Sequence, residues 1–290
     1  MTSIETTPPH ILILGGGYAG LLSANGLRRE LPEAHITLID AQNHFSHRVR
    51  WHEQLTGQDI DRIDYHQFAR ERDIEFIQGH VSTLEPNTKS VQLMTATGSQ
   101  SIQYDKLIYA LGSVSRPLWP WGRPEGVFTL NTQAELDEAE KQLHSAQKVL
   151  IVGSGLTAIE YGCEVAESYP RAKITLITRS TLLSGYSKEA QSYARTVLSN
   201  LNINVVEQAN AKSFDGKQCK TEQGQVFAFD LCLCSIGFLA SPVWQNSGLP
   251  ALNNQQIAVD ENMRAEGFED IWVAGDAAHR TQEGQSVLRM

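Results

Sequence analysis

The sequence predicts an α/β fold made of two doubly wound units with parallel sheets. The prediction rests on an internal repeat, which contains a glycine-rich turn and a later apolar run. An apolar, β-branched run leads into a glycine-rich turn at residues 11–20 and again at residues 149–158, at a constant offset of 138 positions. The match continues downstream, because the apolar runs 36–40 and 174–178 have the same offset. Alanine- and leucine-rich stretches with helical character lie between these runs, at residues 21–31 and 159–168. Each copy therefore predicts a strand, a turn, a helix and a second, parallel strand.

A further repeated segment predicts a third strand in each unit. Residues 104–112 and 229–237 both run from an aromatic residue through an apolar segment to a glycine, which predicts a buried strand that ends in a glycine turn. The polar stretches before them, residues 91–103 and 217–228, alternate with period two and predict antiparallel hairpins. The expected architecture is three-layered, with two Rossmann-like parallel sheets and small antiparallel β additions.

Composition limits the classes of function. The chain has 290 residues, of which 41% are hydrophobic and 20% charged, and this suits a globular protein of one large or two ordinary domains. A net charge of −9 disfavours a nucleic-acid partner, because binding to a phosphate backbone requires a basic face. The four cysteines have neither CxxC spacing nor a histidine at ligand spacing, so no metal site is expected. Cys232 and Cys234 are interpreted as buried small hydrophobes rather than as a redox pair.

Sequence signals for membrane targeting are not found. Residues 1–10 are rich in Thr and Pro and lack the basic and apolar regions of a signal peptide. No stretch approaches the roughly 18 apolar residues that a membrane span needs. We therefore expect a cytoplasmic chain.

The two glycine turns have the spacing of a dinucleotide-binding motif, and each follows a predicted strand and opens a predicted helix, as the motif requires. The first glycine permits a tight turn, the second lets the backbone approach a pyrophosphate, and the third lets helix and strand pack closely. The phosphates then lie at the helix N-terminus. The candidate residues are Gly15, Gly17 and Gly20 in the first unit and Gly153, Gly155 and Ala158 in the second.

The second strands of the two units end differently. Asp40 lies 20 residues past Gly20, where a carboxylate can accept hydrogen bonds from ribose hydroxyls. At the equivalent place the second unit has Thr178, Arg179 and Ser180. A guanidinium and hydroxyls can bind a 2′-phosphate, which a carboxylate would repel. We therefore favour NADPH over NADH in the second unit; the alternative is that Arg179 is a solvated surface residue and that NADH is used.

The motifs together resemble the two-dinucleotide flavoproteins, the FAD-dependent pyridine nucleotide-disulphide oxidoreductases. Residues 271–278 are similar to the second FAD motif of that family, in which the aspartate, here Asp276, hydrogen-bonds the ribityl chain of the flavin. Residues 110–112 and 236–237 resemble the segments that connect the FAD and NAD domains. The cofactor-binding residues that the resemblance adds are Val81, Ala110, Gly112, Gly237, Gly275 and Asp276.

The resemblance also implies a division of the chain. Residues 1–113 and 241–290 are expected to form a split FAD-binding domain, and residues 114–240 an inserted NAD(P)-binding domain. Members of the family continue after the last motif with a helix and a C-terminal interface domain. Residues 282–289 are expected to begin that helix. The interface domain is expected to be absent, with membrane contact made only through it.

The segment 43–57 indicates the branch of the family. It contains no cysteine, which excludes dithiol chemistry, and it resembles type II NADH dehydrogenases and apoptosis-inducing-factor-like proteins. By this resemblance Arg48, Arg50 and His47 lie near the isoalloxazine, where a cation stabilises the reduced flavin. By the same resemblance Glu160 faces the nicotinamide. The alternatives are that the arginines lie on a solvated helix face and that Glu160 only stabilises the first turn of its helix.

These features predict an FAD-dependent NAD(P)H oxidoreductase. It is expected to pass hydride from the nicotinamide of NADPH or NADH to FAD, and then electrons to a quinone or a similar small acceptor. The candidate catalytic residues are Glu160 and Arg50, and Arg48 is counted among the cofactor-binding residues. The alternative is a non-catalytic FAD/NAD(P)-binding or sensor module.

Overall fold

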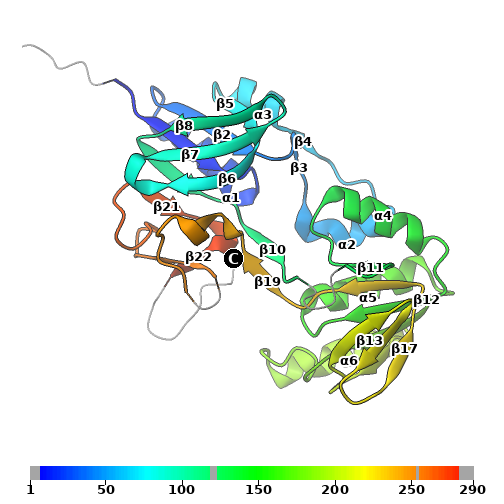
Figure 1. The fold of residues 1–290 in the computed structure, drawn as a ribbon. Helices are drawn as coiled ribbons and strands as arrows, with labels where there is room; N and C mark the ends of the chain where they lie inside the picture. Colours follow the sequence, from blue (N-terminus) through cyan, green and yellow to red (C-terminus); the bar gives the residue numbers. More distant parts are fainter. Residues whose placement is uncertain (1–6, 118–122, 253–254, 281–290) are drawn as a thin grey trace, which may run out of the picture. The chain divides into compact units, whose positions relative to one another are not determined.

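The computed structural model describes residues 7–117, 123–252 and 255–280, and these residues divide into two compact units (Figure 1). Unit 1 contains the described parts of Met1–Ser46, Asp61–Val114 and Leu239–Met290. Unit 2 contains His47–Ile60 and the described parts of Ser115–Phe238. The expected helix at residues 282–289 lies outside the described residues.

Unit 1 is built on a five-stranded sheet whose paired strands are all parallel, in the order β21-β9-β1-β2-β5. Its strands are β1 (His10–Leu14), β2 (His35–Asp40), β5 (Glu75–Gln78), β9 (Lys106–Tyr109) and β21 (Ile271–Val273). Alternate side chains of β1 enter different cores, because successive residues of a strand point to opposite faces. Ile11 and Ile13 pack with the helices α1 (Tyr18–Glu30) and α3 (Tyr65–Glu71), whereas Leu12 and Leu14 pack toward the antiparallel strands.

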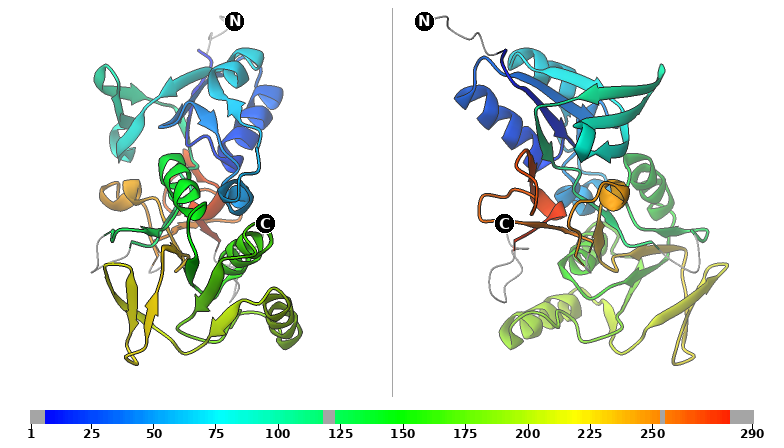
Figure 2. Two further views of the ribbon diagram at one scale, coloured as in Figure 1. Left: turned by 90° about the vertical axis from the view of Figure 1, so that its right-hand side faces the viewer. Right: turned by 60° about the vertical axis from the view of Figure 1, so that its left-hand side comes forward.

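Those antiparallel strands form the third layer of unit 1. They are β6 (His80–Glu85), β7 (Ser90–Thr95) and β8 (Gly98–Gln103). In both views of Figure 2 they lie on the side of the parallel sheet opposite to α1 and α3. Short elements complete the unit: β3 (His44–Phe45), β4 (Ile63–Asp64), β20 (Ile257–Val259), β22 (Ala278–Arg280) and the 3-10 helices Pro86–Thr88, Pro242–Asn246 and Gly275–Ala277.

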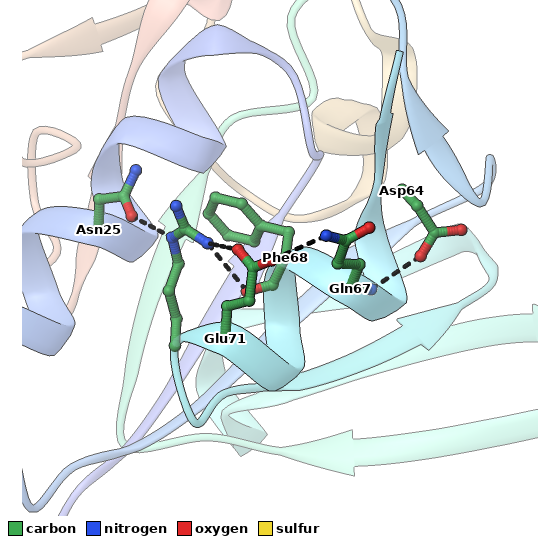
Figure 3. Close-up of polar contacts among 6 residues, drawn as sticks. Asn25, Asp64, Gln67, Phe68 and Glu71 are labelled. Atoms are coloured by element: carbon green, nitrogen blue, oxygen red, sulfur yellow. Dashed lines mark hydrogen bonds and ion pairs between the residues drawn. The ribbon is translucent and has the colours of Figure 1, made fainter.

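Helix α3 is fixed by polar contacts at both ends (Figure 3). At its start the Asp64 carboxylate accepts a hydrogen bond from the backbone N–H of Gln67, the arrangement of an N-cap. Just past its end, Arg72 donates to the Asn25 side chain of α1, and its guanidinium lies 3.9 Å from the centroid of the Phe68 ring. These contacts hold α3 against α1 and thereby fix the position of Tyr65, the first residue of α3.

Unit 2 repeats this plan. Its parallel sheet has the order β11-β18-β12-β13-β14, with β11 (Val127–Phe128), β12 (Lys148–Val152), β13 (Lys173–Ile177), β14 (Asn204–Val206) and β18 (Leu231–Cys234). Val149 and Ile151 face a core formed with helices, and Leu150 and Val152 face the antiparallel sheet. The helices are α4 (Gln133–Leu143), α5 (Leu156–Ser168) and α6 (Lys188–Asn200), and the antiparallel strands are β15 (Ala211–Asp215), β16 (Gln218–Thr221) and β17 (Val226–Ala228).

The internal repeat and both hairpins are confirmed. His10 of β1 pairs with His35 of β2, and at the same offset Lys148 of β12 pairs with Lys173 of β13. Two of the chain segments that join the units are strands β10 (Ser113–Ser115) and β19 (Phe238–Ala240), which form a two-stranded sheet. None of the helices in the described residues is long and apolar enough to cross a membrane.

Residues 47–60 differ from the sequence-based division, because they belong to unit 2 rather than to the first domain. They contain the 3-10 turn Arg48–Arg50 and helix α2 (Trp51–Leu55). Trp51 and Leu55 are buried in the same core as residues of α4 and α5. The apolar face of this short helix therefore finds its partner in unit 2, which a local pattern of apolar residues does not specify.

Candidate functional site

The candidate residues of unit 1 come together at one edge of its sheet. The glycine loop follows β1, Asp40 ends β2, Gly112 follows β9 and Gly275 follows β21. Because these four strands are parallel, their carboxyl ends lie at the same edge. This is the edge at which open α/β sheets bind their ligands.

Packing explains two of the three glycines in the first loop. Gly15 has a φ of +97°, and a methyl group at this position would collide with the carbonyl oxygen of Ala110. A methyl group at Gly20 would collide with the carbonyl oxygen of Gly15. At Gly17, in contrast, no atom lies within 4 Å of the position that a Cβ would take. Gly17 therefore lies next to open space, as a glycine that faces a bound phosphate must.

The helix that follows this loop has no capping side chain. Gly17 is the N-cap of α1 and makes no side-chain hydrogen bond to it, whereas Asp64, Thr132 and Ser187 cap α3, α4 and α6. Amide groups at an uncapped helix start need an acceptor, and phosphate oxygens are suitable ones. The residues present thus fit the pyrophosphate of a dinucleotide.

The Asp40 carboxylate already accepts two hydrogen bonds from the backbone of the protein. Its Oδ2 accepts the N–H of Gly16 at 2.7 Å, and its Oδ1 accepts the N–H of Gln42 at 2.8 Å. Burial raises the pKa of the Asp40 carboxyl, although the two N–H groups act in the opposite direction. Each carboxylate oxygen has a second lone pair, so Asp40 can still accept a hydrogen bond from a ribose hydroxyl.

The carboxylate of Asp276 is exposed and held by a neighbour. Its Oδ2 accepts the hydroxyl of Ser113 at 2.7 Å, and its backbone carbonyl accepts the Gln256 side chain at 2.8 Å. Ser113 directly follows Gly112 but belongs to no sequence motif, so it was not predicted as a site residue. Gly275, with φ +71°, lies close to α1, since a methyl group here would be 3.2 Å from the Cβ of Ala19.

Val81 is a core residue. Its side chain is 3% exposed and packs in the core beneath the antiparallel sheet. It lies two residues after Gly79, whose N–H donates to the carbonyl of Asp40 at 2.9 Å. A contact of Val81 with a cofactor can therefore involve its backbone, and that role stays a prediction.

The second loop lies at the carboxyl edge of the sheet of unit 2. A methyl group at Gly153 would collide with the carbonyl oxygen of Ser235, which follows β18. Gly155 is the N-cap of α5, again without a capping side chain and with no atom within 4 Å of its Cβ position. Ala158 is fully buried, so this loop accommodates a methyl group at the third position. Gly237, with φ +101°, follows β18 at the same edge.

The residues after β13 divide into a buried and an exposed part. The Thr178 side chain is only 2% exposed, and its hydroxyl accepts the N–H of Ser180 at 3.4 Å. The side chain of Arg179 is exposed, and none of the described residues forms a hydrogen bond or an ion pair with it. Arg179 rather than Thr178 is therefore the group that can reach a phosphate at this edge.

Glu160 lies in the second turn of α5, so its expected place in the first turn is wrong. The helix begins at Leu156, directly after Gly155, and its first turn contains no acidic residue. The stabilisation of a first-turn carboxylate by the helix dipole falls off beyond that turn and does not apply to Glu160. Its side chain is exposed.

Arg48 and Glu160 both lie near Tyr161 in unit 2. Burial raises the pKa of the Tyr161 hydroxyl, and the charges of Arg48 and Glu160 act on it in opposite directions. Arg48 also lies 5.2 Å from the centroid of the Trp51 ring, a cation–π contact. The structure thus brings together two candidate residues that are more than 100 positions apart in the sequence. Their action on flavin and nicotinamide stays a prediction.

Arg50 forms an ion pair with Glu53 on the same short segment. Its Nε lies 2.8 Å from Oε1 of Glu53, and the hydrogen bond lowers the pKa of that carboxyl. Both are partly exposed, so the pair contributes little to stability.

The cysteines of the described residues are all free thiols. Cys232 and Cys234 lie on one face of β18 with their sulfur atoms 3.8 Å apart, and both are buried. Burial raises the pKa of Cys232, which keeps it a thiol. The described residues hold no cluster of three or more His, Cys, Asp or Glu side chains that fits a metal ion.

Comparison with known proteins agrees with this geometry. Residues 9–288 match the pyridine nucleotide-disulphide oxidoreductase family. The chain belongs to this family. Membership of this oxidoreductase family, together with the relatives described next, supports an FAD-dependent NAD(P)H oxidoreductase.

Two relatives illustrate the branch. The demethylphylloquinone reductase NdbB of Synechocystis is 26% identical over 96% of this chain and 74% of its own length. The type II NADH:quinone oxidoreductase of Staphylococcus haemolyticus is 26% identical over 92% of this chain and 74% of its own length.

Two solved structures show the same fold. The NAD-dependent persulfide reductase from A. fulgidus has a TM-score of 0.87 at 21% identity, and covers 97% of this chain and 56% of its own. An engineered water-forming NADPH oxidase, bound to NADPH, has a TM-score of 0.84 at 20% identity, and covers 93% of this chain and 63% of its own. The chain thus spans less than two thirds of these two solved relatives.

Proposed function

We propose that the chain transfers electrons from a nicotinamide dinucleotide, preferentially NADPH, through FAD to a quinone-type acceptor. The observation that carries this proposal is the pair of glycine loops at the carboxyl edges of two separate parallel sheets. Each loop opens a helix without a capping side chain, and open space lies next to Gly17 and Gly155. A two-dinucleotide flavoprotein requires two such loops.

Unit 1 is proposed to bind FAD. Asp40 suits the ribose of an adenosine without a 2′-phosphate, and the exposed carboxylate of Asp276 suits the ribityl hydroxyls. The hydroxyl of Ser113 holds Asp276 at 2.7 Å, so that carboxylate is already oriented before a ligand arrives. FAD bound here would supply the hydride acceptor, since no side chain of a protein accepts hydride.

Unit 2 is proposed to bind the nicotinamide dinucleotide, with the 2′-phosphate of NADPH at Arg179. The engineered oxidase supports this preference, because its substitutions introduce consecutive alanine, arginine and serine residues and it is bound to NADPH. This chain has Arg179 and Ser180 in the same order after Thr178. A guanidinium binds a phosphate with two parallel hydrogen bonds, and Arg179 is exposed for such a contact.

A quinone-type acceptor is supported by the names of two relatives, a demethylphylloquinone reductase and a type II NADH:quinone oxidoreductase. Both are enzymes, which favours an enzyme over the non-catalytic binding module. The protein residues that would act in the reaction are those that bind and orient the two dinucleotides, together with Glu160 as the residue proposed to orient the carboxamide.

Anaerobic reduction of the purified, FAD-loaded chain tests the proposal. NADPH should bleach the flavin absorbance rapidly, NADH should do so more slowly, and a water-soluble quinone should restore the absorbance in both cases. Flavin that binds but is not bleached by either nucleotide would contradict the proposed activity. Faster reduction by NADH than by NADPH would contradict the preference for NADPH only.

A further inference from the structure

Gly16, the middle residue of the first glycine loop, is held from both sides by side chains of unit 1. Its N–H donates to Oδ2 of Asp40 at 2.7 Å, and its carbonyl accepts the hydroxyl of Tyr65 at 2.6 Å. Tyr65 is 2% exposed and is the first residue of α3. Two side chains that are distant in the sequence thus bind the same residue of the loop.

The position of Tyr65 is itself well determined. Its backbone N–H donates to the carbonyl of Asn43 at 3.0 Å, and its ring packs against Phe76 with 5.1 Å between the ring centroids. A methyl group at Gly16 would collide with the Tyr65 ring, so the ring lies directly over this glycine. The Tyr65 ring therefore explains why position 16 is a glycine. The backbone conformation does not, because the φ of Gly16 is not positive.

The hydroxyl of Tyr65 stays protonated under ordinary conditions. Burial raises its pKa far above the usual tyrosine value, and the negative charge of Asp40 raises it further. Tyr65 is therefore a permanent donor to the Gly16 carbonyl.

The two hydrogen bonds fix two successive peptide planes. The C=O of Gly16 and the N–H of Gly17 belong to one planar trans peptide and point in opposite directions. When Tyr65 holds this C=O, the N–H of Gly17 has to point away from Tyr65. Asp40 fixes the preceding peptide in the same way through the N–H of Gly16. The space next to Gly17 is the open one in which a phosphate would lie.

We propose that Tyr65 is a positioning residue for the FAD pyrophosphate: through the Gly16 carbonyl it sets the orientation of the Gly17 amide before the dinucleotide binds. This inference rests on the proposed binding of FAD in unit 1. A preoriented donor lowers the cost of binding, because the ligand need not order the loop. Without the hydroxyl, the buried Gly16 carbonyl loses its partner and the peptide can rotate.

The test compares Tyr65→Phe with Tyr104→Phe in the full chain. Tyr104 is a matched control, because it is another buried tyrosine of unit 1, 4% exposed, whose hydroxyl has no hydrogen-bond partner in the described residues. Each protein is freed of flavin and titrated with FAD, and the dissociation constant is followed by flavin fluorescence. The urea midpoint of each apoprotein is measured as well.

Tyr65→Phe should raise the FAD dissociation constant about tenfold, the effect of one lost hydrogen bond, whereas Tyr104→Phe should stay within about twofold of wild type. NADPH binding should be the same in all three proteins. Equal FAD dissociation constants for the two variants, with only the urea midpoint of Tyr65→Phe lowered, would overturn the inference and leave a structural role. A wild-type chain that binds no FAD would overturn the proposed function itself.

Discussion

The two glycine loops of this chain show how one backbone arrangement can be held in two ways. Both loops make the same main-chain hydrogen bonds at an offset of 138 positions: the N–H of Gly15 donates to Ile39 at 2.7 Å, and that of Gly153 donates to Ile177 at 3.1 Å. The middle residues differ. The carbonyl of Gly16 accepts a side-chain hydroxyl, that of Tyr65, whereas the carbonyl of Ser154 accepts a main-chain N–H, that of Leu183, at 2.8 Å.

This difference determines which substitutions each loop can tolerate. In unit 1 a single side-chain change at Tyr65 removes the bond. In unit 2 the donor is the backbone of the segment that follows Arg179, so most side-chain changes leave it intact. The same bond ties the glycine loop to the segment that carries Arg179. In unit 2, therefore, the glycine loop and the segment with the residues proposed to distinguish NADPH from NADH are positioned together.

The largest difference in stability between the two loops is expected from substitutions at the third position of the glycine motif, Gly20 and Ala158. Gly20→Ala should lower the free energy of unfolding by about 3 kcal/mol, because the new methyl group collides with the backbone carbonyl of Gly15. Ala158→Gly, the reverse change in unit 2, should cost about 2 kcal/mol, from a lost buried methyl group and a lower helix propensity. Urea unfolding of both variants measures the two values. Equal losses would mean that the loops are packed alike.

Arg179→Ala should have the next largest effect. A charge-assisted hydrogen bond is worth about 1.5–3 kcal/mol, so the Michaelis constant for NADPH should rise roughly 10- to 100-fold while that for NADH stays nearly constant. Arg171→Ala is the matched control, because Arg171 is exposed and lies before β13, at the opposite edge of the sheet. Steady-state rates with both nucleotides measure the effect. A similar rise for NADPH and NADH would remove the phosphate contact from the account.

The smallest effect is expected at Glu207, which holds the segment after Arg179. Its Oε1 accepts the N–H of Leu182 at 2.8 Å and the guanidinium of Arg195 at 2.6 Å. Burial raises the pKa of Glu207, but these two donors outweigh it, and the pKa is lowered overall from 4.5. The stabilisation is thus present above the ordinary glutamate pKa and is lost as the pH falls through the lowered value.

Glu207→Gln should therefore destabilise the protein by about 0.5 kcal/mol at neutral pH and by less in acid, since the ion pair is partly exposed. Urea midpoints above the ordinary glutamate pKa and below the lowered pKa of Glu207 measure this. A loss that is the same at both pH values would show that the charge of Glu207 is not what stabilises the segment.

The backbone part of the site could be predicted from the sequence, because it depends on local patterns. Apolar runs before Gly15 and Gly153 predict buried parallel strands, and parallel strands bring their carboxyl ends to one edge. Asp40 was found in this way, as the last residue of such a strand. Asp276, in contrast, was implied by the resemblance of residues 271–278 to the second FAD motif of the family.

The side-chain part could not be predicted. Tyr65 binds a backbone carbonyl 49 positions away, and every residue offers a carbonyl, so no residue type marks the partner. The same holds for Ser113, whose partner Asp276 is 163 positions away. The burial of Trp51 and Leu55 in the core of unit 2 was not predicted either, because a short apolar pattern does not specify the surface against which it packs.

The most direct test of the central claim, that two loops bind two different dinucleotides, uses Gly17→Val and Gly155→Val. Both glycines have negative φ values, −67° and −90°, and no atom lies near their Cβ positions, so a side chain fits the backbone and fills only the open space. Bound FAD and NADPH affinity are measured in both variants. Gly17→Val should lose FAD and still bind NADPH, and Gly155→Val should keep FAD and lose NADPH. Loss of both dinucleotides in each variant, or of neither, would contradict the account.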